Sequence, residues 1–186
     1  MHFESKILQL VYLYREEDAN VKILKKNFQK NSIFLDNIPD NLEDLVISEK
    51  SILVIDDFED VLSNDREKAK LIVKFSNYLV HHRRLIIFLI FQSYQLFYAK
   101  HRLNSILYQA TSLILFRSIN NFSMLKRFLN AYDIKLKSGE KLYDIFQKYV
   151  ASKYMYLIVN IHPHIDKPTV YSQILYSDCR PFILFT

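Results

Sequence analysis

The sequence predicts an α/β fold, a mostly parallel sheet with helices on both faces. Apolar runs of strand length recur along the chain and alternate with segments whose apolar residues follow helical spacing. One run, within residues 51–58, has four apolar residues, three of them β-branched, followed directly by Asp56 and Asp57. Such a run suits a strand buried on both faces, as in a parallel sheet covered by helices. The 186 residues are expected to form a single α/β domain, 1–186.

The first half of the chain should hold four strands, at residues 6–14, 32–36, 51–56 and 85–91. Asn20 is the expected cap of a helix over 21–30, and a short helix is expected over 41–45. Ser63 or Asn64 should cap a longer helix that runs to His82, whose apolar residues recur at helical spacing. Strands separated by helices in this way favour right-handed βαβ units.

The second half is expected to continue with a helix or loop over 96–107 and a strand over 112–116. Helices over 123–132 and 140–152 follow, the second with an apolar stripe, and then a strand over 156–161. Residues 171–175 and 182–185 read as a closing edge or hairpin.

Composition limits the possible functions. Gly139 is the only glycine, so this polypeptide has no glycine-rich loop. The net charge of +5 fits an anionic partner without requiring one. The single Cys179 excludes an internal disulfide and a multi-cysteine zinc site. No apolar run reaches 18 residues, so no membrane span is expected, and no membrane is expected among the partners. A reducing compartment is the default.

The adjacent acids Asp56 and Asp57 are the first candidate site. They follow a strand, and ligands of open α/β sheets bind at the carboxyl ends of the strands. Two neighbouring carboxylates repel each other unless a cation or a proton-transfer task offsets the cost. In P-loop nucleotide hydrolases a strand-terminal acid holds Mg²⁺ and a neighbour polarises the attacking water. The structural alternative is a pair that only caps the next turn or helix.

Gln92 closes the most hydrophobic strand of the chain. If that strand lies beside the Asp56 strand, Gln92 lies beside the acids, where it can orient a water or sense a terminal phosphate. A solvated strand end is the structural alternative.

Three basic stretches are further candidates. The turn at residues 81–84 precedes a strand and so belongs to the opposite edge of the sheet. Arg102, in the group 100–102, lies where an arginine finger could reach a neighbouring subunit. Cations interleaved with aromatic residues near Gly139 can serve nucleic-acid backbones and bases, although exposed lysines around a core are the more common arrangement. The cations of this third stretch are Lys126, Arg127, Lys135, Lys137, Lys141 and Lys148.

In order and spacing these features resemble the genome-packaging ATPases of the FtsK/HerA superfamily, especially those of Polinton/Maverick-type elements and related double-stranded DNA viruses. That family has a Walker B strand ending in paired acids, a His-His-Arg-Asn turn, a strand ending in Thr-Gln-Asn, a basic loop with an arginine, and a Leu-Phe-Lys-Asn segment. The corresponding residues here are Ile52 through Asp57, His81 to Arg84, Phe91 to Ser93, Arg102, and Leu115 to Ser118.

The resemblance implies roles for four residues. Asp56 would coordinate Mg²⁺, Asp57 would activate water, Gln92 would act as sensor, and Arg102 would act in trans within a hexameric ring. The implied cofactors are ATP and Mg²⁺. The implied partners are double-stranded DNA, further copies of the chain and capsid proteins, inside a host cell or in the virion.

The chain also departs from that family. The Walker A loop, G-x-x-x-x-G-K-[S/T], is expected before the strand at 6–14, and a chain with one glycine cannot contain it. The chain is therefore expected to be a truncated ATPase, a degenerate copy, or one component whose loop comes from another polypeptide. Arg84, Ser93 and Ser118 stand where the family has asparagine.

Two other functions stay open. One is a non-catalytic DNA-binding or oligomerisation module derived from such an ATPase. The other is an unrelated metal-dependent nuclease or a receiver-like domain that uses Asp56 and Asp57; Asp36 would be a poor phospho-acceptor for a receiver.

Overall fold

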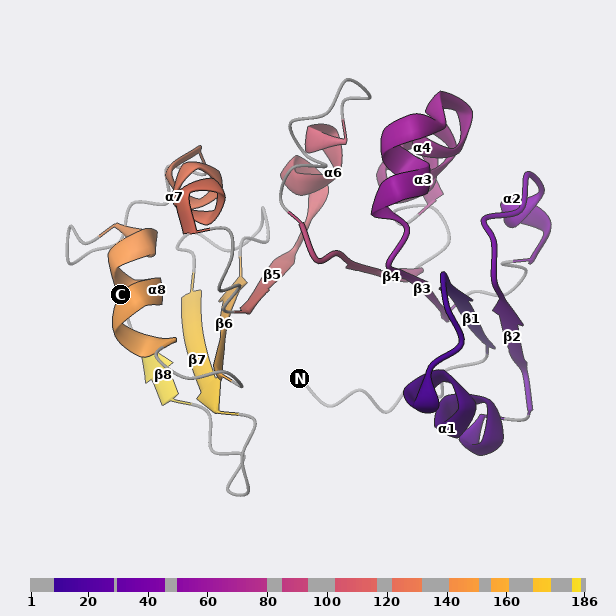
Figure 1. The fold of residues 1–186 in the computed structure, drawn as a ribbon, viewed down its shortest axis with the longest axis horizontal. Coiled ribbons are helices and arrows are strands. Elements are labelled where there is room, and N and C mark those ends of the chain that lie inside the picture. Colours follow the sequence, from indigo (N-terminus) through magenta and orange to yellow (C-terminus); the bar gives the residue numbers. More distant parts are fainter. Residues whose placement is uncertain are drawn as a thin grey trace. The chain divides into compact units, whose positions relative to one another are not determined.

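The chain forms two compact units, Met1–Gln109 and Ala110–Thr186, in a computed structural model (Figure 1). The first contains an all-parallel sheet with helices, which confirms the predicted α/β class. The described residues are 9–28, 30–45, 50–79, 85–93, 103–116, 122–131, 141–150, 155–160, 169–174 and 182–184.

The sheet of the first unit has four parallel strands in the order β2-β1-β3-β4. Its register places Tyr12 opposite both Phe34 and Val54, and Asp56 opposite Tyr14 and Ile90. The carboxyl ends of β3 and β4 therefore meet at one rim, as the sequence predicts. The strands are β1 (Gln9–Tyr14), β2 (Ser32–Leu35), β3 (Ser51–Asp56) and β4 (Ile86–Ile90).

One face of this sheet carries the main core. Alternate side chains of β1 and β3, among them Leu13 and Ile55, are fully buried there against the helices that follow β2 and β3. The core side chains of those helices include Leu42, Leu62 and Phe75. The helical segments are α2 (Leu42–Leu45), α3 (Glu59–Asn64), α4 (Arg66–Lys74), the π-helix η1 (Phe75–Leu79) and α6 (Asn104–Gln109).

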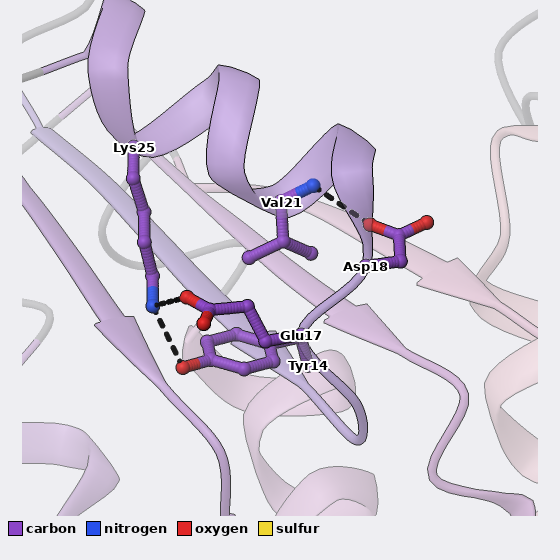
Figure 2. Close-up of polar contacts among 5 residues, drawn as sticks. All are labelled: Tyr14, Glu17, Asp18, Val21 and Lys25. Atoms are coloured by element: carbon purple, nitrogen blue, oxygen red, sulfur yellow. Dashed lines mark hydrogen bonds and ion pairs between the residues drawn. The ribbon is translucent and has the colours of Figure 1, made fainter.

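Helix α1 (Ala19–Asn27) covers the opposite face, below the sheet in Figure 1. Asp18 caps it, because the Asp18 carboxylate accepts the Val21 N–H at 2.8 Å, and Val21 is buried (Figure 2). Lys25 reaches back to the strand, where its Nζ donates to the Tyr14 hydroxyl at 2.9 Å and pairs with Glu17. The helix is thus fixed to the end of β1.

Two predicted helix caps are wrong. Asp18 replaces Asn20 as the cap of α1 because its side chain reaches an unpaired N–H of the first turn. The longer helix predicted after Ser63 or Asn64 is α4, and Asp65 caps it through the N–H groups of Glu67 and Lys68. A separate short helix, α3, precedes it from Glu59 and was not predicted. The predicted end at His82 lies outside the described residues.

Strand β4 is the edge of the sheet as described, and one of its faces is open. Ile86, Phe88 and Ile90 are 40, 45 and 46% exposed, whereas Ile87 and Leu89 pack against the core. Tyr12, Val54 and Asp56 lie on the same face as these three residues, by the register of the ladder. Parallel sheets are normally covered on both faces, so this part of the sheet lacks a cover within the described chain.

The second unit is built on an antiparallel sheet in the order β5-β6-β7-β8. Leu113, Leu115, Leu157 and Val159 are buried on one side of it, and α7 and α8 contribute a core of leucine and phenylalanine. The closing strands pair antiparallel, as the expected hairpin requires. Its elements are β5 (Ser112–Phe116), α7 (Phe122–Ala131), α8 (Leu142–Tyr149), β6 (Met155–Asn160), β7 (Thr169–Ile174) and β8 (Phe182–Leu184).

Among the described residues, no helix has both the length and the apolar character needed to cross a membrane.

Candidate functional site

The two acids leave β3 in different directions. Asp56 is the last residue of the strand, and Asp57 has φ = 64°, in the left-handed region that Asp tolerates better than most residues. The N–H of Asp57 still donates to the carbonyl of Ile90 at 3.2 Å, so the chain stays attached to β4 through this turn. Adjacent carboxylates are thereby separated, one on the open face of the sheet and one toward the end of β4.

Gln92 meets Asp57 at this rim. The Gln92 Nε2 donates to Asp57 Oδ1 at 3.0 Å, although 35 residues separate them in the sequence. The predicted proximity of Gln92 to the acid pair is therefore confirmed. The catalytic roles of the two residues remain predictions.

A third acid, Glu59, joins the same group. It is the first residue of α3, and its Oε1 accepts the backbone N–H groups of Gln92 and, at 3.2 Å, of Ser93. This carboxylate ties the start of α3 to the segment that carries Gln92. Sequence reasoning missed it, although its position two residues after Asp57, where the chain turns into a helix, was a usable signal.

The pKa of Glu59 is raised above its usual value, first because the group is half-buried and also because it shares a hydrogen bond with Asp57. The amide donors of Gln92 and Ser93 act in the opposite direction. Gln92 therefore contacts both acids, since its side chain donates to Asp57 and its backbone N–H donates to Glu59.

Tyr12 holds the other acid. Its hydroxyl donates to Asp56 Oδ2 at 2.7 Å, and its ring stacks on Phe34 with centroids 5.8 Å apart. Burial, and then the hydrogen bond to Asp56, raise the pKa of Tyr12 far above its usual value, so the hydroxyl stays a donor throughout the physiological range. Sequence reasoning did not single out Tyr12, because the contact joins strands 44 residues apart.

The donor set suits a hard cation only in part. Carboxylate oxygens are the ligands that Mg²⁺ prefers, and Tyr12 uses one oxygen of Asp56, leaving Oδ1 as a candidate ligand. Within the described ranges, no group of three or more His, Cys, Asp or Glu side chains could hold a metal. Because Mg²⁺ is usually bound by one or two carboxylates together with substrate phosphates, the acids fit a shared site better than an all-protein cage.

Several candidate residues lie outside the described residues. These include Arg102 with its neighbours 100–101, the basic turn 81–84, and Lys135 and Lys137. Of the basic stretch near Gly139, the structure describes Lys126, Arg127, Lys141 and Lys148, all on or beside α7 and α8 and all exposed.

Comparison with known proteins gave no relative: no protein-family model, no curated protein and no solved structure matches this chain.

Proposed function

We propose that this chain is the larger part of an ATP-hydrolysing motor domain of the genome-packaging kind, whose phosphate-binding loop is supplied from outside these 186 residues. The hydrogen bond from Gln92 to Asp57 carries the proposal. It joins an acid and an amide at the carboxyl rim of a parallel sheet, where such sheets bind their ligands. The motor would move double-stranded DNA into capsids as a ring of copies, inside a host cell or in the virion.

Each residue of the rim has a task in the proposed reaction. Asp56, oriented by Tyr12, would hold Mg²⁺, which when bound neutralises the phosphate oxygens of ATP. Asp57 would accept the proton of the attacking water, and Gln92 beside it would orient that water toward the terminal phosphate. Arg102 would act on the ATP of a neighbouring copy.

The exposed edge and open face of β4 are consistent with a further segment that would carry the proposed phosphate-binding loop. A further strand could pair with the edge of β4, and a helix after it could cover Ile86, Phe88 and Ile90. The turn between that strand and helix would then lie at the same rim as Asp56, Asp57 and Glu59. Three carboxyl groups there favour a segment that carries a lysine and binds phosphate with Mg²⁺.

The test is phosphate release from ATP by the chain together with its loop segment, taken either from the coding sequence upstream of Met1 or from a co-encoded polypeptide. The chain alone should release no phosphate above background. The completed protein should turn over ATP only with Mg²⁺. Asp57→Asn should lower kcat by about 10²- to 10³-fold and Gln92→Ala by about 10-fold, as expected for loss of a base and of a positioning group.

Asp60→Asn is the matched control, since Asp60 lies three residues after Asp57, in the first turn of α3, but pairs with Arg15 at 3.2 Å. It should leave turnover within about two-fold. No G-x-x-x-x-G-K-[S/T] segment in either source, or turnover unchanged by Asp57→Asn, would contradict the proposal.

A non-catalytic DNA-binding module is the second candidate, favoured by the distribution of charge. Met1–Gln109 carries 15 basic and 15 acidic residues, whereas Ala110–Thr186 carries ten and five, so the whole net charge of +5 belongs to the second unit. Such a module would bind DNA with the same affinity after Asp57→Asn, and would show no ATP turnover when the loop segment is added.

A further inference from the structure

The positive charge that the structure describes in the second unit lies on two helices and at the start of one of them. Every basic residue that the structure describes in Ala110–Thr186 lies on α7, on α8 or at the first residue before α8. Asp144 is the only acid among the described residues of this unit. The described parts of its sheet carry no charged residue at all. The basic surface that the structure describes in this unit is therefore formed by α7 and α8.

Helix α7 presents a single stripe of hydrogen-bond donors. Ser123, Lys126, Arg127 and Asn130 are exposed, and their spacing of three and four residues places them on one side of the helix. Leu125, Phe128 and Leu129 are buried on the other side. The ten residues of α7 include no acid. At 1.5 Å per residue the stripe is about 10 Å long, a length that spans more than one phosphate of a nucleic-acid strand.

Helix α8 packs against α7 and supports this stripe. The Lys126 ammonium lies 5.4 Å from the ring centroid of Tyr143, a cation–π contact between the two helices. Lys141 and Lys148 are exposed at the two ends of α8, seven residues apart and thus on nearly the same side of it.

The chemistry of the stripe favours a phosphate backbone over unpaired bases. Hydroxyl, ammonium, guanidinium and amide groups are the donors that proteins direct at phosphate oxygens. Single strands are held instead by aromatic faces on which bases stack. On the described part of α7, Phe128 is buried, and the Tyr143 ring of α8 is occupied by Lys126.

We propose that the exposed stripe of α7, Ser123, Lys126, Arg127 and Asn130, is the surface by which this protein contacts the phosphate backbone of double-stranded DNA. The identity of the partner rests on the proposed function; the location of the contact rests on the charge and exposure of α7.

The test is the affinity of the full chain for a fluorescently labelled 30-base-pair duplex of arbitrary sequence, measured by anisotropy between 50 and 200 mM KCl. Lys126→Gln combined with Arg127→Gln removes two charges without introducing an apolar patch or a helix breaker. It should weaken binding by about 10- to 100-fold at 50 mM salt. The log–log salt slope should fall by roughly two, about one for each lost phosphate contact.

The matched control removes the same charge elsewhere. Lys22 and Lys26 are exposed on α1, in the charge-balanced unit, so Lys22→Gln with Lys26→Gln should leave affinity within about two-fold. The charge-conserving variant Lys126→Arg with Arg127→Lys should retain most of the binding, which separates loss of charge from misfolding.

Three results would overturn the inference. Equal losses in the α7 and α1 variants would indicate attraction by net charge alone. An unchanged salt slope in the α7 variant would place the contacts elsewhere. Tighter binding of single-stranded DNA than of duplex, abolished by Phe116→Ala, would instead assign the partner to the open sheet face, where Phe116 is 51% exposed and packs on Tyr156. None of these measurements needs ATP, so a failed hydrolysis test leaves this one standing, and the reverse also holds.

Discussion

The two units differ in how they use charge. All five ion pairs that join described residues lie in Met1–Gln109, where basic and acidic residues are equal in number. In that unit three acids gather at one rim of a parallel sheet, held by Tyr12 and Gln92. In Ala110–Thr186 an antiparallel sheet without described charge carries two basic helices. Under our two proposals, phosphate-directed chemistry would belong to the first unit and polyanion binding to the second.

We expect the two units to unfold independently of each other. Leu53 and Leu157 are fully buried leucines on inner strands of the two sheets. Leu53→Ala should lower the free energy of unfolding of the first unit by about 3 kcal/mol, through lost burial and the cavity left behind. Amide hydrogen exchange should then be faster in β1 and β3 and unchanged in β6, with the reverse pattern for Leu157→Ala. If either variant loosens both sheets equally, the chain folds as one cooperative body.

Sequence patterns located the strands well, because a short run of Ile, Leu, Val and Phe between turn residues allows few other structures. The patterns did not reveal strand direction in the second sheet, which depends on pairing with distant residues such as Ile158 with Tyr171. They also gave no sign that Ile86, Phe88 and Ile90 would be exposed, since hydrophobicity does not say which face finds a cover.

The candidate site was only half predictable. Asp56, Asp57 and Gln92 follow apolar strands, so their shared rim follows from the order of the strands. Tyr12 and Glu59 entered through contacts across 44 and 34 residues, which no local pattern encodes. The short acidic helix α3 was not predicted, and the cap of α4 was placed one or two residues before Asp65.

The hydrogen bond from Tyr12 to Asp56 should stabilise the rim that carries Asp56, Asp57 and Glu59. Tyr12→Phe removes a hydrogen bond to a carboxylate and should cost about 1.5 kcal/mol, measured by urea unfolding at pH 7. Because the pKa of Tyr12 is raised in the folded state, its contribution is fully present below the ordinary tyrosine pKa of about 10 and is lost as pH rises beyond it. As pH rises above about 10, the free energy of unfolding of Tyr12→Phe should therefore fall less than that of the wild type. Tyr14→Phe is the control and should keep that drop.

Added salt should change the unfolding free energies of the two units differently, and this effect should be smaller than those of the substitutions above. Because the second unit carries the whole net charge, its like charges repel one another, and raising NaCl from about 20 to 200 mM screens that repulsion. Its unfolding free energy should rise by about half a kcal/mol, read from amide exchange in β6. The unfolding free energy of the first unit should stay unchanged or fall slightly, because salt screens its exposed ion pairs. A gain in the first unit as large as in the second would contradict the charge assignment.

The smallest expected effect tests the raised pKa of Glu59. A raised folded-state pKa means that Glu59 contributes most at low pH, below the ordinary glutamate value of about 4.3, and that this contribution is lost as pH rises through the folded-state pKa. Gln cannot ionise, so Glu59→Gln should gain stability relative to the wild type between pH 4 and 7. The gain should be only a few tenths of a kcal/mol, since the group is half-exposed and solvent reduces the cost of its charge.

Asp60→Asn is the control for this comparison, because Asp60 lies in the same helical turn and pairs with Arg15 at the surface. If Glu59→Gln and Asp60→Asn follow the same pH dependence, the loss of any negative charge at the start of α3 accounts for the effect. A pH dependence confined to Glu59→Gln would instead assign the effect to the half-buried Glu59 carboxyl itself.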